Sequence, residues 1–293
     1  MTAAVTSGAT TAPQRWWPAP AKVNLFLHIT GRRSDGYHDL QTVFQLLDFG
    51  DALALEVTEE PAIERVAGPA EILPAQDLCV RAAQLLQRHG AVQQGVRIRL
   101  RKRIPLGGGL GGGSSDAATV LRVLNGLWRV GLSLDDLAGL GLQLGSDVPV
   151  FIRGHSAWAE GRGELLTPLP LPERWYLLIH PGVTVATASI FQAPELTRNS
   201  PVITIRAVSE AQTRNDCEPV VRARFPAVAA ALDWLSAYAP ARLSGTGSCV
   251  FASFERAAVA ERVAARVPDE WRSFVARGVN RSSLEDALTS RMR

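Results

Sequence analysis

The chain has 293 residues, of which 46% are hydrophobic and 20% are charged, and its formal net charge is +3. This balance is ordinary for a folded protein of one large or two medium-sized domains, and it argues against a fibrous or intrinsically disordered chain. No apolar run approaches the roughly 20 residues of a membrane-spanning helix, and the three widely spaced cysteines support neither a disulfide framework nor a zinc site.

Residues 1–15 are rich in Thr, Ala, Ser and Gly and lack the features of a secretory signal, so we expect a disordered tail there. A first domain is expected over residues 16–160. Alternation over residues 21–29 predicts a strand whose polar face carries Lys22, Asn24 and His28. The other elements predicted in this domain are strands over 53–57 and 97–104, and helices over 77–89, 117–127 and 134–145.

The composition changes between residues 155 and 165, where we expect the boundary to a second domain over residues 161–293. The elements predicted there are strands over 175–179, 241–243 and 249–254, and helices over 225–238, 256–265 and 282–291. Because strands and helices are mixed in both halves, the pattern predicts an α+β fold of two domains.

The basic residues comprise 29 arginines and only two lysines, Lys22 and Lys102, and they are spread along the whole chain. A nucleic-acid-binding protein would concentrate its positive charge, so we expect no nucleic acid as partner. The lack of a long apolar run argues against a membrane partner, and the lack of a disulfide framework suits a reducing cytoplasm. In a chain that uses arginine by default, Lys22 in its apolar strand is a candidate for a site that needs a compact ammonium group. Lys102 lies in the basic run 97–103, whose alternation predicts a half-buried strand with a solvated basic face.

A run of six glycines in seven residues lies between a predicted strand and a predicted helix. Glycine permits positive φ and lets a ligand approach the backbone closely, and consecutive amides before a helix N-terminus bind anions. The sequence therefore predicts a phosphate-binding loop formed by Pro105, Leu106, Gly107, Gly108, Gly109, Leu110, Gly111, Gly112, Gly113, Ser114 and Ser115.

Three other interpretations of this glycine run compete with a phosphate-binding loop of this kind: a flexible linker, a Walker A motif and a dinucleotide-binding motif. A flexible linker rarely joins a strand directly to an amphipathic helix. The Walker A motif is excluded, because Gly113 is followed by Ser114 and not by a lysine. The dinucleotide-binding spacing is matched, but the acidic residues about 20 positions later, Asp135 and Asp136, begin a helix and do not end a strand.

The run 105–115 resembles the ATP loop of the GHMP kinases, and its sequence is most similar to that of the 4-diphosphocytidyl-2-C-methyl-D-erythritol kinases. Further stretches resemble the same family in the same order along the chain, between residues 19 and 254. They are Ala19-Pro20-Ala21-Lys22-Val23-Asn24-Leu25, Asp35-Gly36-Tyr37-His38, Leu144-Gly145-Ser146-Asp147-Val148-Pro149, Asn215-Asp216-Cys217-Glu218 and Leu243-Ser244-Gly245-Thr246-Gly247.

The resemblance implies a two-domain fold, with an N-terminal domain like ribosomal protein S5 domain 2, a ferredoxin-like C-terminal domain and the active site between them. It implies phosphoryl transfer from ATP to the 2-hydroxyl of 4-diphosphocytidyl-2-C-methyl-D-erythritol, in the non-mevalonate route to isoprenoids. It also implies a need for Mg²⁺, and a monomer or weak homodimer. Another small-molecule kinase, of the homoserine or mevalonate type, and an RNA-binding protein are the competing functions.

The resemblance assigns catalysis to Lys22 and Asp147. Asp147 would orient the attacking hydroxyl and accept its proton, as an aspartate does in other kinases, and Lys22 would stabilise negative charge near the transferred group. Without the resemblance, Asp147 before Val148-Pro149 is equally typical of a helix N-cap, and Lys22 could extend its ammonium to water from a strand edge.

The resemblance also assigns substrate-binding residues. His38 would recognise the edge of the cytosine, and Tyr37 and Phe191 would stack on its two faces, although core packing is the ordinary role of a residue such as Phe191. Asn24 would contact the substrate, or would be a buried amide paired within the protein. Thr187 would also contact the substrate, although the sequence around it departs from the family pattern. Asp116 stands where some relatives have Asn, so the sequence does not identify a metal ligand.

Overall fold

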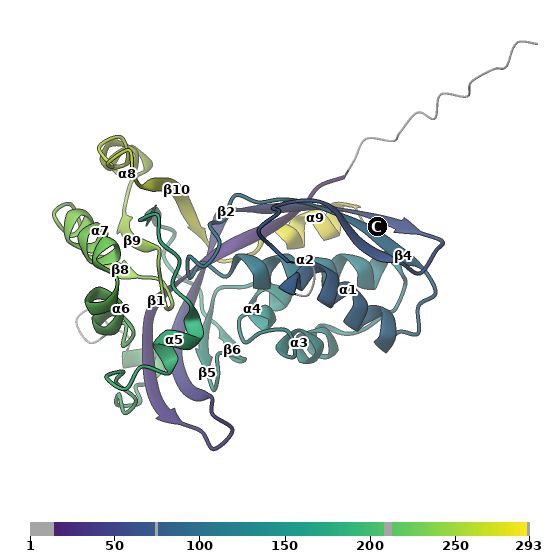
Figure 1. Cartoon of the computed structure of the whole chain (residues 1–293), viewed down its shortest axis with the longest axis horizontal. Coiled ribbons are helices and arrows are strands. Elements are labelled where there is room, and N and C mark those ends of the chain that lie inside the picture. The colour runs from purple at the N-terminus through teal and green to yellow at the C-terminus, as the bar shows by residue number, and fades with distance from the viewer. Residues whose placement is uncertain (1–14, 74–75, 208–212, 292–293) are drawn as a thin grey trace, which may run out of the picture.

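The computed structural model describes residues 15–73, 76–207 and 213–291. Apart from Arg15, the predicted tail over residues 1–15 lies outside the described residues. Two long antiparallel strands, β1 (Trp17–Arg32) and β2 (His38–Thr58), run through both halves of the molecule, as Figure 1 shows in purple. They carry the tight turn at residues 33–37 at one end, and they link the two halves into one sheet.

The sheet is organised around β2. This strand pairs with β1, with β4 (Gly95–Arg101), with β5 (Ala157–Glu160) and with β10 (Arg272–Val279). Beyond β4 lies β3 (Ile63–Ala67), and beyond β10 lie β7 (Trp175–His180), β9 (Val250–Phe254) and β8 (Ala241–Leu243), while β6 (Leu165–Pro168) pairs with β5.

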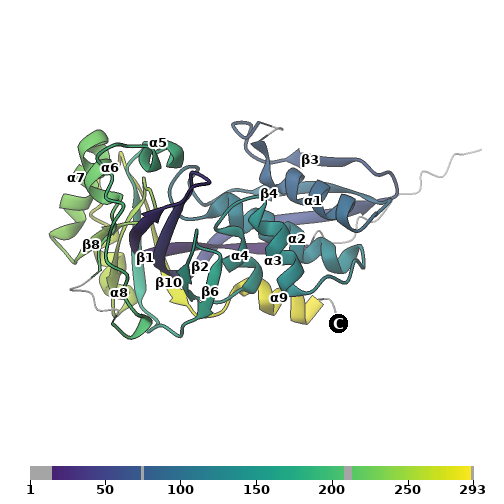
Figure 2. The same ribbon diagram turned by 90° about the horizontal axis from the view of Figure 1, so that it is seen from below.

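The helices form two groups, one for each half of the sheet (Figure 2). The first group covers the half that contains β4; its members are α1 (Leu78–His89), α2 (Gly112–Leu127), α3 (Leu134–Leu142) and α4 (Val148–Arg153). The second group packs on the other half; its members are α5 (Thr187–Phe191), α6 (Glu218–Arg224), α7 (Pro226–Ser236) and α8 (Ala257–Ala264), and a 3₁₀ turn spans Ile205–Ala207.

The last helix, α9 (Ser283–Arg291), returns to the N-terminal half of the molecule. Its Leu284 and Ala287 form a small buried cluster with Trp17 of β1 and Val123 of α2. Among the described residues, no helix combines the length and apolar composition that a membrane span requires.

Most predicted elements are confirmed, and their ends have clear local causes. The Asp77 carboxylate accepts hydrogen bonds from the first amides of α1, and Ser133 and Asp136 form a reciprocal capping box at the start of α3. The predicted α+β fold is also confirmed. Strands β3, β5, β6 and β10 and helices α4, α5 and α6 were not predicted.

Two predictions near β2 and β4 need correction. The predicted strand over 53–57 is confirmed, but it is the end of a strand of 21 residues that begins at His38. Gly50 marks the place where the backbones of β1 and β2 approach most closely, because a Cβ there would lie 2.3 Å from the carbonyl oxygen of Ala19. The basic strand ends at Arg101, so Lys102 does not belong to its alternation.

Candidate active site

A cavity of about 1000 Å³ lies between the two halves of the molecule. All but one of the residues predicted for catalysis, phosphate binding and substrate binding line it, although they come from β1, the β1–β2 turn, the glycine run, the start of α4, and α5. The exception is Ser115, which is buried in α2. The fold thus brings segments that are up to about 170 residues apart in the sequence to one place.

The glycine run ends inside a helix. Helix α2 begins at Gly112, so Gly113, Ser114 and Ser115 form its first turn, and its N-cap, Gly111, has a left-handed conformation (φ 72°) without a side-chain cap. The Ser115 amide donates to the Gly111 carbonyl at 2.9 Å. The amides that precede it at the start of the helix lie before the first intrahelical acceptor, so they are left for a ligand, and the positive end of the helix dipole faces the same place. This geometry suits a phosphate group.

The glycines are needed because the loop packs tightly against neighbouring backbone. Gly109 has φ 71°, and a Cβ there would lie 2.1 Å from the carbonyl oxygen of Ser244. The Ser244 hydroxyl donates to the Gly109 carbonyl at 2.9 Å, and the Cys249 amide donates to the Gly108 carbonyl at 3.1 Å. The Gly245-Thr246-Gly247 turn, which the resemblance brings near the site, lies against this loop and lines the cavity.

Lys22 and Asp147 form an ion pair at the edge of the glycine loop. The Lys22 Nζ lies 3.1 Å from Asp147 Oδ2, and it also donates to Asn24 Oδ1 at 2.6 Å and to the Gly109 carbonyl at 3.1 Å. The Lys22 side chain is 3% exposed, so the interpretation in which it extends to water is wrong. Three acceptors therefore hold one ammonium in place beside the loop.

Asp147 occupies the N-cap position of α4, but its side chain makes no capping hydrogen bond. The carboxylate is instead directed to Lys22, and it is 33% exposed at the cavity. Interpretation of Asp147 as a side-chain N-cap is therefore wrong. A carboxylate that is partly open to the cavity can meet a hydroxyl group there.

Asn24 is engaged on both sides of its amide. Its Oδ1 accepts from Lys22, and its Nδ2 donates to the Thr42 hydroxyl at 2.9 Å. The Thr42 hydroxyl in turn donates to the Phe26 carbonyl at 2.5 Å. Asn24 is thus the buried amide of the alternative interpretation and also lines the cavity, where it fixes the position of the Lys22 ammonium.

Aromatic side chains line the end of the cavity that is formed by the β1–β2 turn and α5. The rings of His38 and Phe191 lie 5.2 Å apart and are tilted by 30°. Phe191 also packs against the core of the C-terminal half, so core packing and cavity lining coexist there. Tyr37 is 52% exposed, and the Arg162 guanidinium lies over its ring at 4.5 Å. The Thr187 hydroxyl, at the start of α5, shares a hydrogen bond of 3.0 Å with Thr246.

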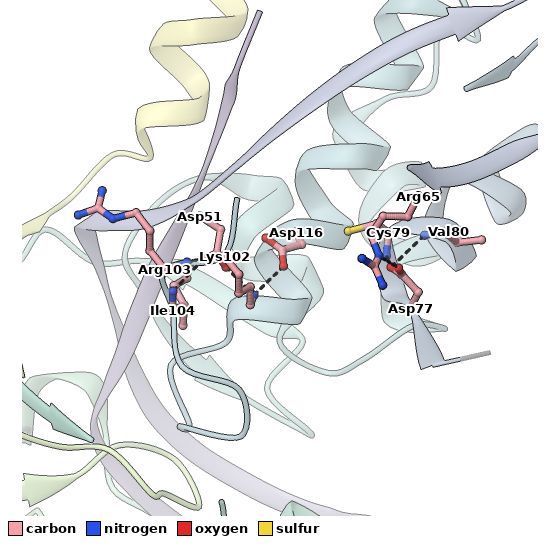
Figure 3. A network of polar contacts seen from close by, with 9 residues as sticks. All are labelled: Asp51, Arg65, Asp77, Cys79, Val80, Lys102, Arg103, Ile104 and Asp116. Carbon is pink, nitrogen blue, oxygen red and sulfur yellow. Dashed lines mark hydrogen bonds and ion pairs between the residues drawn. The ribbon is translucent and has the colours of Figure 1, made fainter. Parts of the chain in front are cut away.

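Lys102 lies on the other side of the glycine run in a buried charge network, which Figure 3 shows. Its Nζ lies 2.5 Å from Asp51 Oδ2 and 2.7 Å from Asp116 Oδ2, and its side chain is 10% exposed. The prediction of a solvated Lys102 was therefore wrong. The physical reason is that the strand has ended and that two carboxylates from β2 and α2 meet the side chain.

Burial raises the pKa of Asp116 to about 7, because the attraction of Lys102 offsets only part of the cost of a buried charge and Asp51 adds repulsion. The pKa of Lys102 is also raised, since the two carboxylates outweigh its burial. Asp116 does not line the cavity, and its Oδ1 is buried without a hydrogen-bond partner. These contacts direct Asp116 to Lys102 and away from any ligand in the cavity.

Among the residues around the cavity that sequence reasoning missed are Lys102 and Arg162, which line it, and Arg198, which supports one of its walls. Arg198 donates from Nε to the His38 ring, and Arg162 covers Tyr37. Neither residue stands out in a chain with 29 arginines. The only signal at Lys102 was its residue type, because the carboxylate of Asp51 that meets it lies 51 residues away in the sequence.

Comparisons with known proteins agree with this geometry. The models of the N-terminal and C-terminal domains of the GHMP kinases match residues 77–155 and 194–273. A protein of Alkalilimnicola ehrlichii named 4-diphosphocytidyl-2-C-methyl-D-erythritol kinase is 58% identical over 92% of this chain and 93% of its own length. One of the same name from Halorhodospira halophila is 53% identical over 94% of this chain and 97% of its own length.

Solved structures show the same fold. A crystal structure of 4-(cytidine 5'-diphospho)-2C-methyl-D-erythritol kinase matches with a TM-score of 0.78 and 34% identity, over 90% of this chain and all of that one. The mevalonate kinase of Methanococcus jannaschii matches with a TM-score of 0.68 over 92% of this chain and all of that one. At 15% identity it is similar in fold alone.

Proposed function

The chain belongs to the GHMP kinase family and, within it, to the 4-diphosphocytidyl-2-C-methyl-D-erythritol kinases, and we propose from this premise how its residues act. The reaction is transfer of the γ-phosphoryl group of ATP to the 2-hydroxyl of 4-diphosphocytidyl-2-C-methyl-D-erythritol, in the non-mevalonate route to isoprenoids. The alternatives of a homoserine or mevalonate kinase and of an RNA-binding protein are not favoured. The observation that carries the assignment of roles is the Lys22–Asp147 pair beside the glycine loop.

Asp147 is proposed to orient the attacking hydroxyl and to accept its proton. Its carboxylate pairs with Lys22 and is partly exposed to the cavity, where a hydroxyl group can approach it. A positioned base of this kind contributes roughly 10²–10⁴-fold to the rate. The Lys22 ammonium, 3.1 Å away, holds the carboxylate in position beside the glycine loop.

Lys22 is proposed to stabilise the charge that develops around the transferred phosphoryl group. Its ammonium is fixed by Asn24 and by the Gly109 carbonyl, so it does not have to reorganise during the reaction. The amides at the start of α2 and the Ser114 hydroxyl would hold the phosphate chain of ATP on the same side.

The end of the cavity formed by the β1–β2 turn and α5 is proposed to bind the cytosine, with Tyr37, His38 and Phe191 as recognition residues and Thr187 beside them. The supporting observation is that these side chains line the same cavity as the Lys22–Asp147 pair and the glycine loop. Such an arrangement suits a long substrate with a base at one end and a hydroxyl at the other.

Mg²⁺ is proposed to accompany ATP. Among the described residues there is no group of three or more His, Cys, Asp or Glu side chains that could hold a metal ion. Magnesium is commonly held by one or two protein oxygens together with substrate phosphates, so the Ser114 hydroxyl and the Asp147 carboxylate fit such an ion. When bound, it would neutralise charge on the phosphates.

We further propose two domains over residues 16–160 and 161–293, a monomer or weak homodimer, and a cytoplasmic location. The family matches to the two halves support the division. The three cysteines are free and buried, which suits a reducing compartment.

ADP release by the purified protein tests the proposed substrate. We expect ATP turnover that depends on 4-diphosphocytidyl-2-C-methyl-D-erythritol, with no comparable turnover on mevalonate or homoserine. Turnover that is unchanged by the cytidine substrate, or that is faster with mevalonate or homoserine, would contradict the proposal.

A further inference from the structure

Arg198 follows α5 and holds two walls of the cavity together. Its Nε donates to His38 Nε2 at 3.1 Å. Its Nη1 donates to the Leu196 carbonyl at 3.0 Å, and its Nη2 donates to the carbonyls of Phe191 at 3.0 Å and Ala193 at 2.6 Å. One guanidinium thus fixes the His38 ring and the backbone that carries the Phe191 ring.

The contact with Arg198 determines where His38 carries its proton. A guanidinium only donates hydrogen bonds, so the Nε2 of His38 must accept. In the neutral ring, the proton then lies on Nδ1. Burial and the positive charges of Arg198 and Arg32 lower the pKa of His38, against the opposing effect of Asp39, and this keeps the ring neutral near pH 7.

The other ring nitrogen is left for a ligand. Among the hydrogen bonds between described residues, none involves His38 Nδ1, and the His38 side chain lines the cavity. The His38 ring also lies against that of Phe191, at 5.2 Å between centroids, and Arg198 contacts the segments that carry both rings. A hydrogen-bond donor is therefore presented beside an aromatic surface.

We propose that Arg198 is a positioning residue for base recognition, which holds His38 as an Nδ1–H donor and so selects a pyrimidine with an acceptor at N3. Cytosine has such an acceptor, whereas N3 of uracil carries a hydrogen that would oppose the His38 donor. This inference rests on the proposed function, because it assumes that the base end of the substrate lies at His38. Arg198 touches no reacting atom and acts through His38 and the Phe191 backbone.

Steady-state kinetics of the variants Arg198→Met and Arg198→Lys test this role. A lost or misdirected hydrogen bond to a base costs about tenfold in affinity. We expect the KM for the cytidine substrate to rise about tenfold in Arg198→Met, and the preference over the uridine counterpart to fall by a similar factor. The KM for ATP and kcat should change less than about twofold, because the glycine loop and the Lys22–Asp147 pair are not touched. Arg198→Lys should not restore recognition, since an ammonium cannot reproduce the four-bond fork.

A double-mutant cycle with His38→Ala separates positioning from a general structural effect. If Arg198 acts through His38, Arg198→Met should add little to the KM of His38→Ala. Arg222 provides the matched control, because it pairs with Asp233 on the surface and does not line the cavity. Arg222→Met should leave both KM values at the wild-type level.

The ¹⁵N chemical shifts of the His38 ring give a readout that does not depend on activity. We expect the Nδ1–H tautomer in the wild-type protein and a mixture of tautomers in folded Arg198→Met. An Nε2–H tautomer in the wild type would overturn the proposal even if Arg198→Met does not fold. An unchanged KM for the cytidine substrate in folded Arg198→Met, or additive effects in the cycle, would also overturn it. If the wild type does not use the cytidine substrate, the proposed function fails, and the ring nitrogen assignment is still decided by the spectra.

Discussion

The chain has two lysines, and both are buried beside the glycine run, yet their surroundings differ. Lys22 pairs with one carboxylate, Asp147, which is 33% exposed at the cavity. Lys102 pairs with two carboxylates, Asp51 and Asp116, which are 0% and 2% exposed. The carboxylate partner of Lys22 is therefore open to the cavity, where it can meet a substrate, whereas the two carboxylate partners of Lys102 are closed off from it.

The Lys102 network connects the segments on both sides of the glycine loop. Asp51 Oδ1 accepts from the amides of Arg103 and Ile104, which lead into the loop, at 2.6 and 2.8 Å. Asp116 lies in α2, which leads out of it. Lys102 bridges the two carboxylates, so it joins the entry of the loop to its exit (Figure 3). We therefore expect changes in the Lys22–Asp147 pair to act on catalysis and changes in the Lys102 network to act on stability.

The largest effect is expected at Lys102. Lys102→Met leaves two buried carboxylates without a cation, and removal of one partner of a buried ion pair destabilises a protein by about 3–5 kcal/mol. Denaturant unfolding should show this loss. Arg97, an exposed residue of β4, is the matched control, and Arg97→Met should change the free energy of unfolding by less than about 0.5 kcal/mol. Equal stability of the Lys102 and Arg97 variants would contradict the assignment.

A change of Lys22 to arginine sharpens the comparison. The Lys22 Nζ lies 2.6 Å from Asn24 Oδ1 and 5.4 Å from the centre of the Phe44 ring, so the larger planar guanidinium must displace its neighbours. We expect kcat of Lys22→Arg to fall about 100-fold, the size of effect seen when one fixed electrostatic group is lost.

The same change at Lys102 should act on stability. A Cβ on Gly112 would lie 2.8 Å from the Lys102 Nζ, so there is little room for a guanidinium. Lys102→Arg should therefore lower the free energy of unfolding by about 1–3 kcal/mol.

For the Lys22→Arg variant, a kcat near that of the wild type would show that a positive charge of any shape suffices at Lys22.

The smallest effect is expected from Asp116→Asn, and it depends on pH. The pKa of Asp116 is about 7 in the folded protein, above its ordinary value of 3.8. Between these values the folded state holds a proton that the unfolded state has lost, so stability should fall as the pH rises from about 4 to about 7. Asp116→Asn should remove this part of the pH dependence, while the change at pH 4, where both side chains are uncharged in the folded protein, stays below about 1 kcal/mol. A parallel pH profile for the wild type and the variant in denaturant unfolding would exclude this role of Asp116.

The glycine loop could be predicted from local spacing and residue type, and the Lys22–Asp147 pair and the substrate-binding residues from the resemblance of their motifs to a known family. Prediction failed where contacts between distant segments determine the structure. Nothing in the sequence around Gly50 indicates that β1 and β2 approach each other closely there. The helix α4 has six residues, which is too short to show a helical period.

The role of Lys102 could not be predicted from alternation. The basic strand ends one residue before it, and its two partners come from β2 and α2. Arg198 was missed for a related reason, because its target on His38 lies 160 residues away and arginine is the default basic residue of this chain.

The most direct test of the account is single-turnover phosphoryl transfer by Asp147→Asn, with 4-diphosphocytidyl-2-C-methyl-D-erythritol and ATP bound at saturation. Asparagine keeps the size of the side chain and removes its ability to accept a proton. We predict that the variant folds and binds both substrates, and that the rate of formation of the 2-phosphorylated product falls at least about 100-fold. A single-turnover rate equal to that of the wild type would contradict the assignment of Asp147 as the proton acceptor.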